Sequence, residues 1–246
     1  KIYLKLNPSL IQAGKFSINT SMNLQEIFEK LALAEDETVW VTIPEGLRYD
    51  EIAIIWSENL EESIYEDFIF LAENKLVSRD TAEGYLFPDT YNIKVDSTAE
   101  DVFNLMYNNF QNKVGEINYN TLILASIVER EAITDEERPI VAGILKKRLD
   151  TNGWLLQADA TLLYESKDWT TPITVKMKES KSLYNSYYNP DLPPTPICNP
   201  GLKSIEAARN PKTNTEYWFY LHGKDGQIRY AVTQDQHIQN INNYLR

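Results

Sequence analysis

The segment from Thr121 to Ala132 limits the fold more than any other stretch of the chain, because its first two helical turns are apolar on almost every side. A helix of that composition has to be buried rather than lie on a surface. Its polar end carries two carboxyl groups, Glu129 and Glu131. The sequence therefore predicts a core helix that ends in a pair of glutamates.

Helical spacing places the two glutamates on roughly opposite sides of this helix. Glu131 follows Ile127 and Val128 on an apolar stripe, whereas Glu129 lies over Ala125. A carboxyl group on an apolar stripe is partly desolvated, which raises its pKa and keeps it protonated. A general acid for glycosidic cleavage near neutral pH needs that property.

The same residues also fit a solvated helix end, in which Arg130 and Arg138 are the salt-bridge partners of Glu129 and Glu131. Taken alone, the segment favours this second interpretation. The choice between them depends on the rest of the chain.

The composition excludes several kinds of partner and site. The 246 residues include 36 acidic and 24 basic side chains, a formal charge of −12, whereas phosphate binding normally needs a basic surface. We therefore expect no nucleic-acid partner. A single cysteine, Cys198, excludes an intramolecular disulfide and a cysteine-based zinc site, and His222 and His237 are too few for a histidine-rich metal site. No cofactor or metal is implied.

The first third of the chain predicts short strands and helices. The strands are expected over 2–6, 15–18 and 39–43, and the helices over 24–33, from Asp50 onward, and over 65–74. The last strand and the two helices that follow make a small βαα unit, which resembles a LysM module, a peptidoglycan-binding unit. A small structural subdomain without a ligand of its own fits the same pattern.

The remainder of the chain has a different character. Helices are expected over 100–114, 121–149 and 205–209, a strand or turn leading into a helix over 154–165, and a β-hairpin over 217–221 and 228–232. The segment 183–201, rich in Pro, Asn and Tyr, predicts an ordered aromatic loop that forms a groove wall. The expected fold class is α+β, with a LysM-like part over 1–78 and a mixed α/β catalytic domain over 79–246 that ends in the hairpin.

Several short motifs, in this order along the chain, resemble the YceG-like family, the endolytic murein transglycosylases. They are Leu10–Ser17, Val41–Gly46, Glu83–Tyr91, Leu124–Glu131, Leu156–Thr161, Tyr184–Tyr187, Leu192–Ile197 and Asn199–Gly201, followed by the terminal hairpin and His237. Each motif alone is weak, but the ordered set is specific. Three positions depart from the family pattern: Ala160 replaces a common Pro, Ser186 a common Thr, and Thr195 a usual Gly.

The resemblance implies non-hydrolytic cleavage of the β-1,4 bond between N-acetylmuramic acid and N-acetylglucosamine, with a 1,6-anhydro ring on the product. One carboxyl group can serve as acid and then as base, and Glu131 matches the second glutamate of the family's catalytic helix. Glu129 is the alternative for this role. Two further interpretations stay open: a non-catalytic peptidoglycan-binding or scaffold protein, and a two-carboxylate hydrolase in which Glu83 or Asp159 partners Glu131.

The resemblance also suggests a set of substrate-binding residues. They are Glu83, Glu129, Gln157, Asp159, Tyr184, Asn185, Tyr187 and Asn199. Most of them have an equally ordinary structural role. Glu83 can brace the turn after it, Asp159 can cap a helix, and Asn199 and His237 can satisfy loop backbone.

The expected location also follows from the resemblance. The chain starts abruptly at Lys1 with no apolar run of transmembrane length, so we expect a preceding membrane anchor and a site of action on the extracytoplasmic face of the bacterial cell membrane. Peptidoglycan strands are the expected partner, and cell-wall synthases are a further one.

Overall fold

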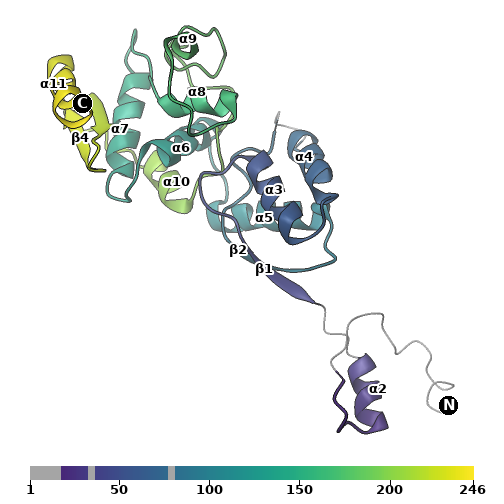
Figure 1. Ribbon diagram of the computed structural model, residues 1–246. Helices are drawn as coiled ribbons and strands as arrows, with labels where there is room; N and C mark the ends of the chain where they lie inside the picture. The colour runs from purple at the N-terminus through teal and green to yellow at the C-terminus, as the bar shows by residue number, and fades with distance from the viewer. Residues whose placement is uncertain (1–17, 33–36, 77–80) are drawn as a thin grey trace.

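The computed structural model describes residues 18–32, 37–76 and 81–246. Within these ranges the expected α+β class is confirmed (Figure 1). The elements are α2 (Leu24–Ala32), β1 (Thr38–Thr42), α3 (Tyr49–Asn59), α4 (Ile64–Asn74), β2 (Thr90–Lys94), α5 (Ala99–Val114), α6 (Tyr119–Glu131), α7 (Arg138–Leu149), α8 (Asp159–Ser166), α9 (Val175–Lys178), α10 (Leu202–Arg209), β3 (Phe219–His222), β4 (Ile228–Ala231) and α11 (Gln234–Tyr244). The strand expected over 2–6, and most of that over 15–18, lie outside the described residues.

The first hydrophobic core forms where α3, α4 and α5 pack beside an antiparallel pair of strands, β1 and β2. Alternation along β1 directs Val41 inward, while Trp40 opposite Asn92 stays 67% exposed. The largest side chains of this core, Trp56 and Phe68 among them, are completely buried. Helices α3 and α4 confirm the helical part of the predicted βαα unit.

The two strands of this pair come from either side of residue 78. Strand β1 belongs to the proposed LysM-like part and β2 to the proposed catalytic part, and one hydrophobic core extends over both. The division near residue 78 and the likeness to a LysM module stay predictions.

The second core is built around α6, as the sequence predicts. Its residues from Leu122 to Val128 are all buried, and α7 and α10 pack against it. Ser126 is the polar exception, and its hydroxyl donates to the Ile123 carbonyl and accepts the Ile197 N–H at 2.9 Å. A buried hydroxyl with both kinds of partner carries little desolvation cost.

The helical range expected over 121–149 is in fact two helices, because the chain turns between α6 and α7. Ala132 adopts an extended conformation that ends α6. The Glu137 carboxylate then accepts the N–H groups of Ile133 and Thr134, and Pro139 lies in the first turn of α7, where its missing N–H costs nothing. The spacing of the apolar residues does not indicate this break.

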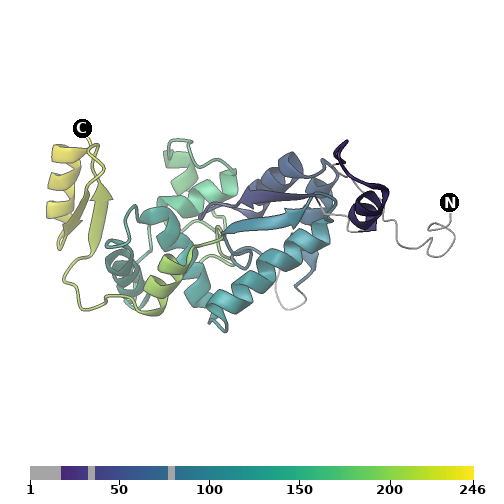
Figure 2. The same cartoon turned by 90° about the horizontal axis from the view of Figure 1, so that it is seen from below.

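The predicted C-terminal hairpin is confirmed as β3 and β4, which pair antiparallel with Tyr220 opposite Tyr230. Helix α11 packs on both strands, and the three elements form one end of the elongated molecule (Figure 2). None of the helices in the described ranges combines the length and the hydropathy that a membrane span requires.

A network of buried polar groups around Glu83 and Asn199 joins the two cores. The Asn199 side-chain oxygen accepts the N–H groups of Gly84 and Leu86, both at 2.9 Å, and its Nδ2 donates to Glu83 Oε1 at 2.7 Å. Glu83 also accepts the N–H of Tyr49 at 3.1 Å. Both side chains are completely buried. Their hydrogen bonds therefore take the place of water for the polar groups of three chain segments, at Tyr49, after Glu83 and at Asn199.

Burial dominates the ionisation of Glu83. It raises the pKa of this carboxyl group to about 8, although the hydrogen bonds from Tyr49 and Tyr164 oppose the shift. The folded protein therefore holds a proton on Glu83 at pH values where the unfolded chain has lost it.

We predict that Glu83→Gln removes part of the pH dependence of stability. Because the pKa of Glu83 is higher in the folded state, the contribution of Glu83 to the free energy of unfolding is fully present below about pH 4.5. It is lost as the pH rises toward 8. The free energy of unfolding of the wild type should fall relative to the variant over this range, by at most about 1.4 kcal/mol per pH unit. Urea denaturation at successive pH values measures this difference.

The matched control is Glu62→Gln, since Glu62 is an exposed carboxylate beside α4. Its stability should follow the wild type at every pH. Parallel curves for wild type and Glu83→Gln would mean that Glu83 is ionised in the folded protein.

Candidate active site

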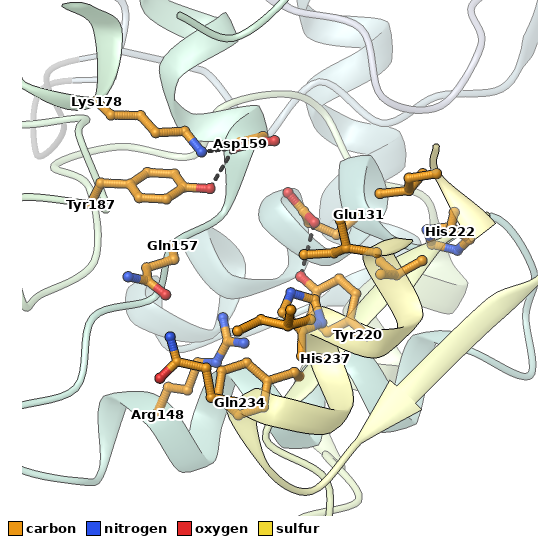
Figure 3. A pocket seen from close by; sticks show the side chains of 15 residues that line it. Glu131, Arg148, Gln157, Asp159, Lys178, Tyr187, Tyr220, His222, Gln234 and His237 are labelled. Carbon is orange, nitrogen blue, oxygen red and sulfur yellow. Dashed lines mark hydrogen bonds and ion pairs between the residues drawn. The ribbon is translucent and has the colours of Figure 1, made fainter. Parts of the chain in front are cut away.

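A cleft of about 620 Å³ lies between the end of α6, the start of α8 and the C-terminal unit of β3 and α11 (Figure 3). Polar and aromatic side chains share its walls. They are Glu131, Arg148, Gln157, Asp159, Lys178, Tyr187, Phe219, Tyr220, Leu221, His222, Gln234, His237, Ile238, Ile241 and Leu245. Four of the residues named from the sequence are therefore brought together here: Glu131, Gln157, Asp159 and Tyr187.

Glu131 is the last residue of α6 and reaches the cleft from the second core. Its Oε2 accepts the hydroxyl of Tyr220 at 2.9 Å, and its Oε1 accepts the Ala160 N–H at a longer 3.4 Å. Burial raises the pKa of Glu131, while these hydrogen bonds act in the opposite direction. The net shift is upward, which favours the protonated form that a general acid requires.

Asp159 and Tyr187 form the opposite wall with Lys178 (Figure 3). The Tyr187 hydroxyl donates to Asp159 Oδ1 at 2.5 Å, and the Lys178 ammonium lies 3.9 Å from the same oxygen and 4.2 Å from the Tyr187 ring centroid. Asp159 is the first residue of α8, and Ala158 occupies the N-cap position instead. The side chain of Asp159 is thus directed to Tyr187 and Lys178, and the proposed helix cap is not formed.

Gln157 enters the cleft from a strained backbone position. Its φ of +54° is in the left-handed region, which costs free energy for any residue other than glycine. The N–H of Gln157 donates to the Ser186 carbonyl at 3.0 Å, which anchors this conformation to the aromatic loop. The side chain is exposed and faces the cleft.

Arg148 supports the floor of the cleft from α7. Its guanidinium donates to the carbonyls of Leu156 and Trp218, with Nε at 3.0 Å from the latter. The ring centroid of Tyr220 lies 5.9 Å from its Cζ. Arg148 therefore joins the segment before Gln157 to the start of the hairpin.

The two histidines of the chain both line the cleft. His237 stacks on Phe219 at 5.2 Å between ring centroids, and burial lowers its pKa. Its Nδ1 is buried without a hydrogen-bond partner among the residues that the structure describes. His222 lies 3.1 Å from a Glu137 carboxylate oxygen and so connects the hairpin to the turn after α6.

Glu129 lies on another side of α6, between α7 and α10. Its Oε1 is 3.2 Å from Nη2 of Arg138, and its Oε2 accepts the Gly201 N–H at 2.9 Å. Both side chains of this ion pair are nearly buried, at 7% exposure for Glu129 and 10% for Arg138. The salt bridge expected for a helix end thus involves Glu129, whereas Glu131 faces the cleft.

Four other residues named from the sequence have structural contacts away from the cleft. Glu83 and Asn199 form the buried network described above. Asn185 is completely buried and donates to carbonyls at the end of α9, including that of Ser180 at 2.6 Å. Tyr184 bonds the Thr195 hydroxyl at 2.8 Å. Contact of these four with substrate stays a prediction.

The three departures from the family pattern lie next to these contacts. Ala160 supplies an N–H to Glu131 that a proline would lack. Ser186 Oγ accepts the Ala158 N–H at 3.0 Å, and Thr195 is the partner of Tyr184. Each of the three residues therefore has a defined hydrogen-bond partner in the structure.

Tyr220, Arg148 and Lys178 are among the lining residues that were not singled out from the sequence. Tyr220 comes from a hairpin 89 residues after Glu131, and Arg148 and Lys178 follow ordinary charged surface patterns on their helices. Nothing in their local sequence distinguishes them from solvated side chains. In the described part of the chain, no group of three or more His, Cys, Asp or Glu side chains is placed to hold a metal ion.

Comparison with known proteins gives consistent results. The chain is 29% identical over 267 residues to an endolytic murein transglycosylase of Bacillus subtilis, covering 95% of this chain and 73% of that protein. It is 27% identical to an endolytic murein transglycosylase of Streptococcus pneumoniae, with 94% of this chain aligned to 50% of that protein. The chain thus spans about half the length of the pneumococcal relative.

A crystal structure of a yceG-like protein from Listeria monocytogenes has the same fold, with a TM-score of 0.73 and 27% identity over 97% of this chain and 88% of that one. The sequence model of the YceG-like family matches residues 1–243, which is almost the full length of this chain. The protein described here therefore belongs to the YceG-like family.

Proposed function

We propose that this protein is an endolytic peptidoglycan lytic transglycosylase that uses Glu131 as its acid and base. The observation that carries the proposal is the carboxyl group of Glu131, which reaches a polar and aromatic cleft from a buried helix and has a raised pKa. Relatives that cover nearly all of this chain bear the name endolytic murein transglycosylase.

The proposed reaction needs no water and no second carboxyl group. Glu131 donates its proton to the oxygen that links the two sugars, and the bond from that oxygen to C1 of N-acetylmuramic acid breaks. The C6 hydroxyl of the same sugar attacks C1 and forms the 1,6-anhydro ring, and its proton passes to the Glu131 carboxylate. Attack within one sugar is favoured by an effective concentration of about 10⁵ M or more when the geometry is right.

The surroundings of the other carboxylates support a single acid and base. Asp159 is held by Tyr187 and Lys178, which suits a residue that orients the substrate. Glu83 is bonded to Asn199 and Tyr49 in the buried network. Gln157, Asp159 and Tyr187 are the proposed substrate-binding residues, since they present amide, carboxylate and aromatic groups to the same cleft as Glu131.

Two other functions remain as outcomes of the test. A two-carboxylate hydrolase would use Asp159, which shares the cleft with Glu131, to activate water. A scaffold protein would bind glycan strands without cutting them. The proposed activity also implies a site of action at the extracytoplasmic face of the cell membrane, with an anchor before the present chain and cell-wall synthases as neighbours.

We predict that Glu131→Gln lowers the rate of strand cleavage by roughly 10²–10⁴-fold, because glutamine cannot donate the proton and a positioned acid contributes about that much. Mass spectrometry of digested, purified peptidoglycan measures the products. Wild type should release fragments with anhydro ends. Reducing ends would indicate the hydrolase, and binding without fragments would indicate the scaffold protein.

We predict that Glu129→Gln, in contrast, keeps the activity and lowers the stability of the protein. Loss of the carboxylate leaves the nearly buried Arg138 without its charged partner on α6, so the free energy of unfolding should fall by roughly 2 kcal/mol. Anhydro products should still form at a temperature where the variant is folded. Thermal unfolding and the product assay together test this, and an inactive but stable Glu129→Gln variant would transfer the acid role to Glu129.

A further inference from the structure

The C-terminal hairpin brings a tyrosine hydroxyl to the carboxyl group of Glu131. Tyr220 lies in β3, and its hydroxyl is 2.9 Å from Glu131 Oε2, across 89 residues of sequence. Burial raises the pKa of Tyr220 well above its ordinary value, so this group remains a neutral O–H donor throughout the range in which a carboxyl titrates. Figure 3 shows the two side chains meeting at the centre of the cleft.

Other ionisable groups also face Glu131 from the elements packed around it. They are Arg148 on α7, Asp159 on α8, Lys178 on α9, Tyr187 in the aromatic loop, Tyr220 and His222 on β3, and His237 on α11. Asp159 raises the pKa of Glu131 and Arg148 lowers it, while burial is the largest influence. Tyr220 is the member of this group that donates a hydrogen bond to the carboxyl oxygen itself.

We propose that Tyr220 is a positioning residue that holds Oε2 of the acid, Glu131. The transferable proton then resides on Oε1, and Glu131 can donate it near the operating pH. The inference rests on the proposed function. A hydroxyl that donates to Oε2 makes this oxygen the acceptor of the neutral acid, and the remaining oxygen carries the proton. Oε1 has only the longer contact with the Ala160 N–H, at 3.4 Å.

The hydrogen bond also limits the effect of burial on the acid. A carboxyl group that is only desolvated becomes a progressively weaker acid, and proton transfer is most efficient when the acid's pKa lies near the operating pH. A donor that favours the carboxylate opposes this shift. The hairpin thereby links the C-terminal unit to the chemistry at the end of α6.

The test is Tyr220→Phe, which removes the hydroxyl and keeps the ring. Glutamate labelled with ¹³C at the side-chain carboxyl allows NMR titration of Glu131, whose signal is assigned by its absence in Glu131→Gln. Loss of a hydrogen bond to a charged group should lower the acid dissociation constant of Glu131 roughly tenfold. The pKa of Glu131 therefore rises, and the alkaline limb of kcat/KM against pH should move upward with it.

The control is Tyr230→Phe, because Tyr230 is the cross-strand partner of Tyr220 and stacks on Tyr217 instead. It should leave both the titration and the pH profile unchanged. Thermal unfolding of each variant confirms that the hairpin is folded.

An unchanged titration midpoint and an unchanged alkaline limb in Tyr220→Phe would overturn the inference. If the wild type forms no anhydro products, the proposed function fails, but the NMR midpoint still decides whether Tyr220 controls the carboxyl group. If the wild type is active and Tyr220→Phe loses activity equally at every pH with an unchanged midpoint, its role is structural and the inference fails as well.

Discussion

The hydrogen bonds among Glu83, Asn199 and the backbone around them are the contact on which the rest of the structure depends. They join the segment before α3, the turn after Glu83 and the loop before α10, all of which are far apart in sequence. These buried N–H and carbonyl groups have to find partners inside the protein, since an unsatisfied one costs more than an ordinary hydrogen bond contributes. The first core is thereby held against the loop that closes the second.

The polar end of helix α6 makes contacts on two sides. One side of its polar end carries Glu129, whose carboxylate ties α7 and the start of α10 to the helix. Glu131, two residues later, reaches the cleft. The apolar body of the helix keeps water away from both glutamates. Burial strengthens the attraction between Glu129 and Arg138 on one side. On the other side it raises the pKa of Glu131.

Much of the second core was predictable from the sequence. The apolar run of α6, the hairpin signals after Tyr217 and the apolar stripe behind Glu131 are local patterns that the structure contains. The break between α6 and α7 was not predictable, because it depends on the extended backbone of Ala132 and on a turn braced by the Glu137 carboxylate, and not on a change in periodicity.

The residues of the candidate site were also only partly predictable. Glu131, Gln157, Asp159 and Tyr187 could be named in advance and share one cleft. Asn185, Asn199 and Glu83 carry the same chemical groups and lie in the same motifs, yet their side chains bond to buried backbone. A carboxyl or amide that binds sugar and one that braces a loop look identical in a sequence, because both roles need the same donors and acceptors.

The sequence by itself determined several of the helical segments, the burial of α6 and the position of Glu131 on an apolar stripe, since these depend on the period and composition of neighbouring residues. Only the tertiary structure decided that Tyr220 contacts Glu131, that Arg148 supports the floor of the cleft and that β1 pairs with β2 across residue 78. Those contacts join residues far apart along the chain. They form because burying two cores at once brings particular polar groups together, and no local pattern contains that information.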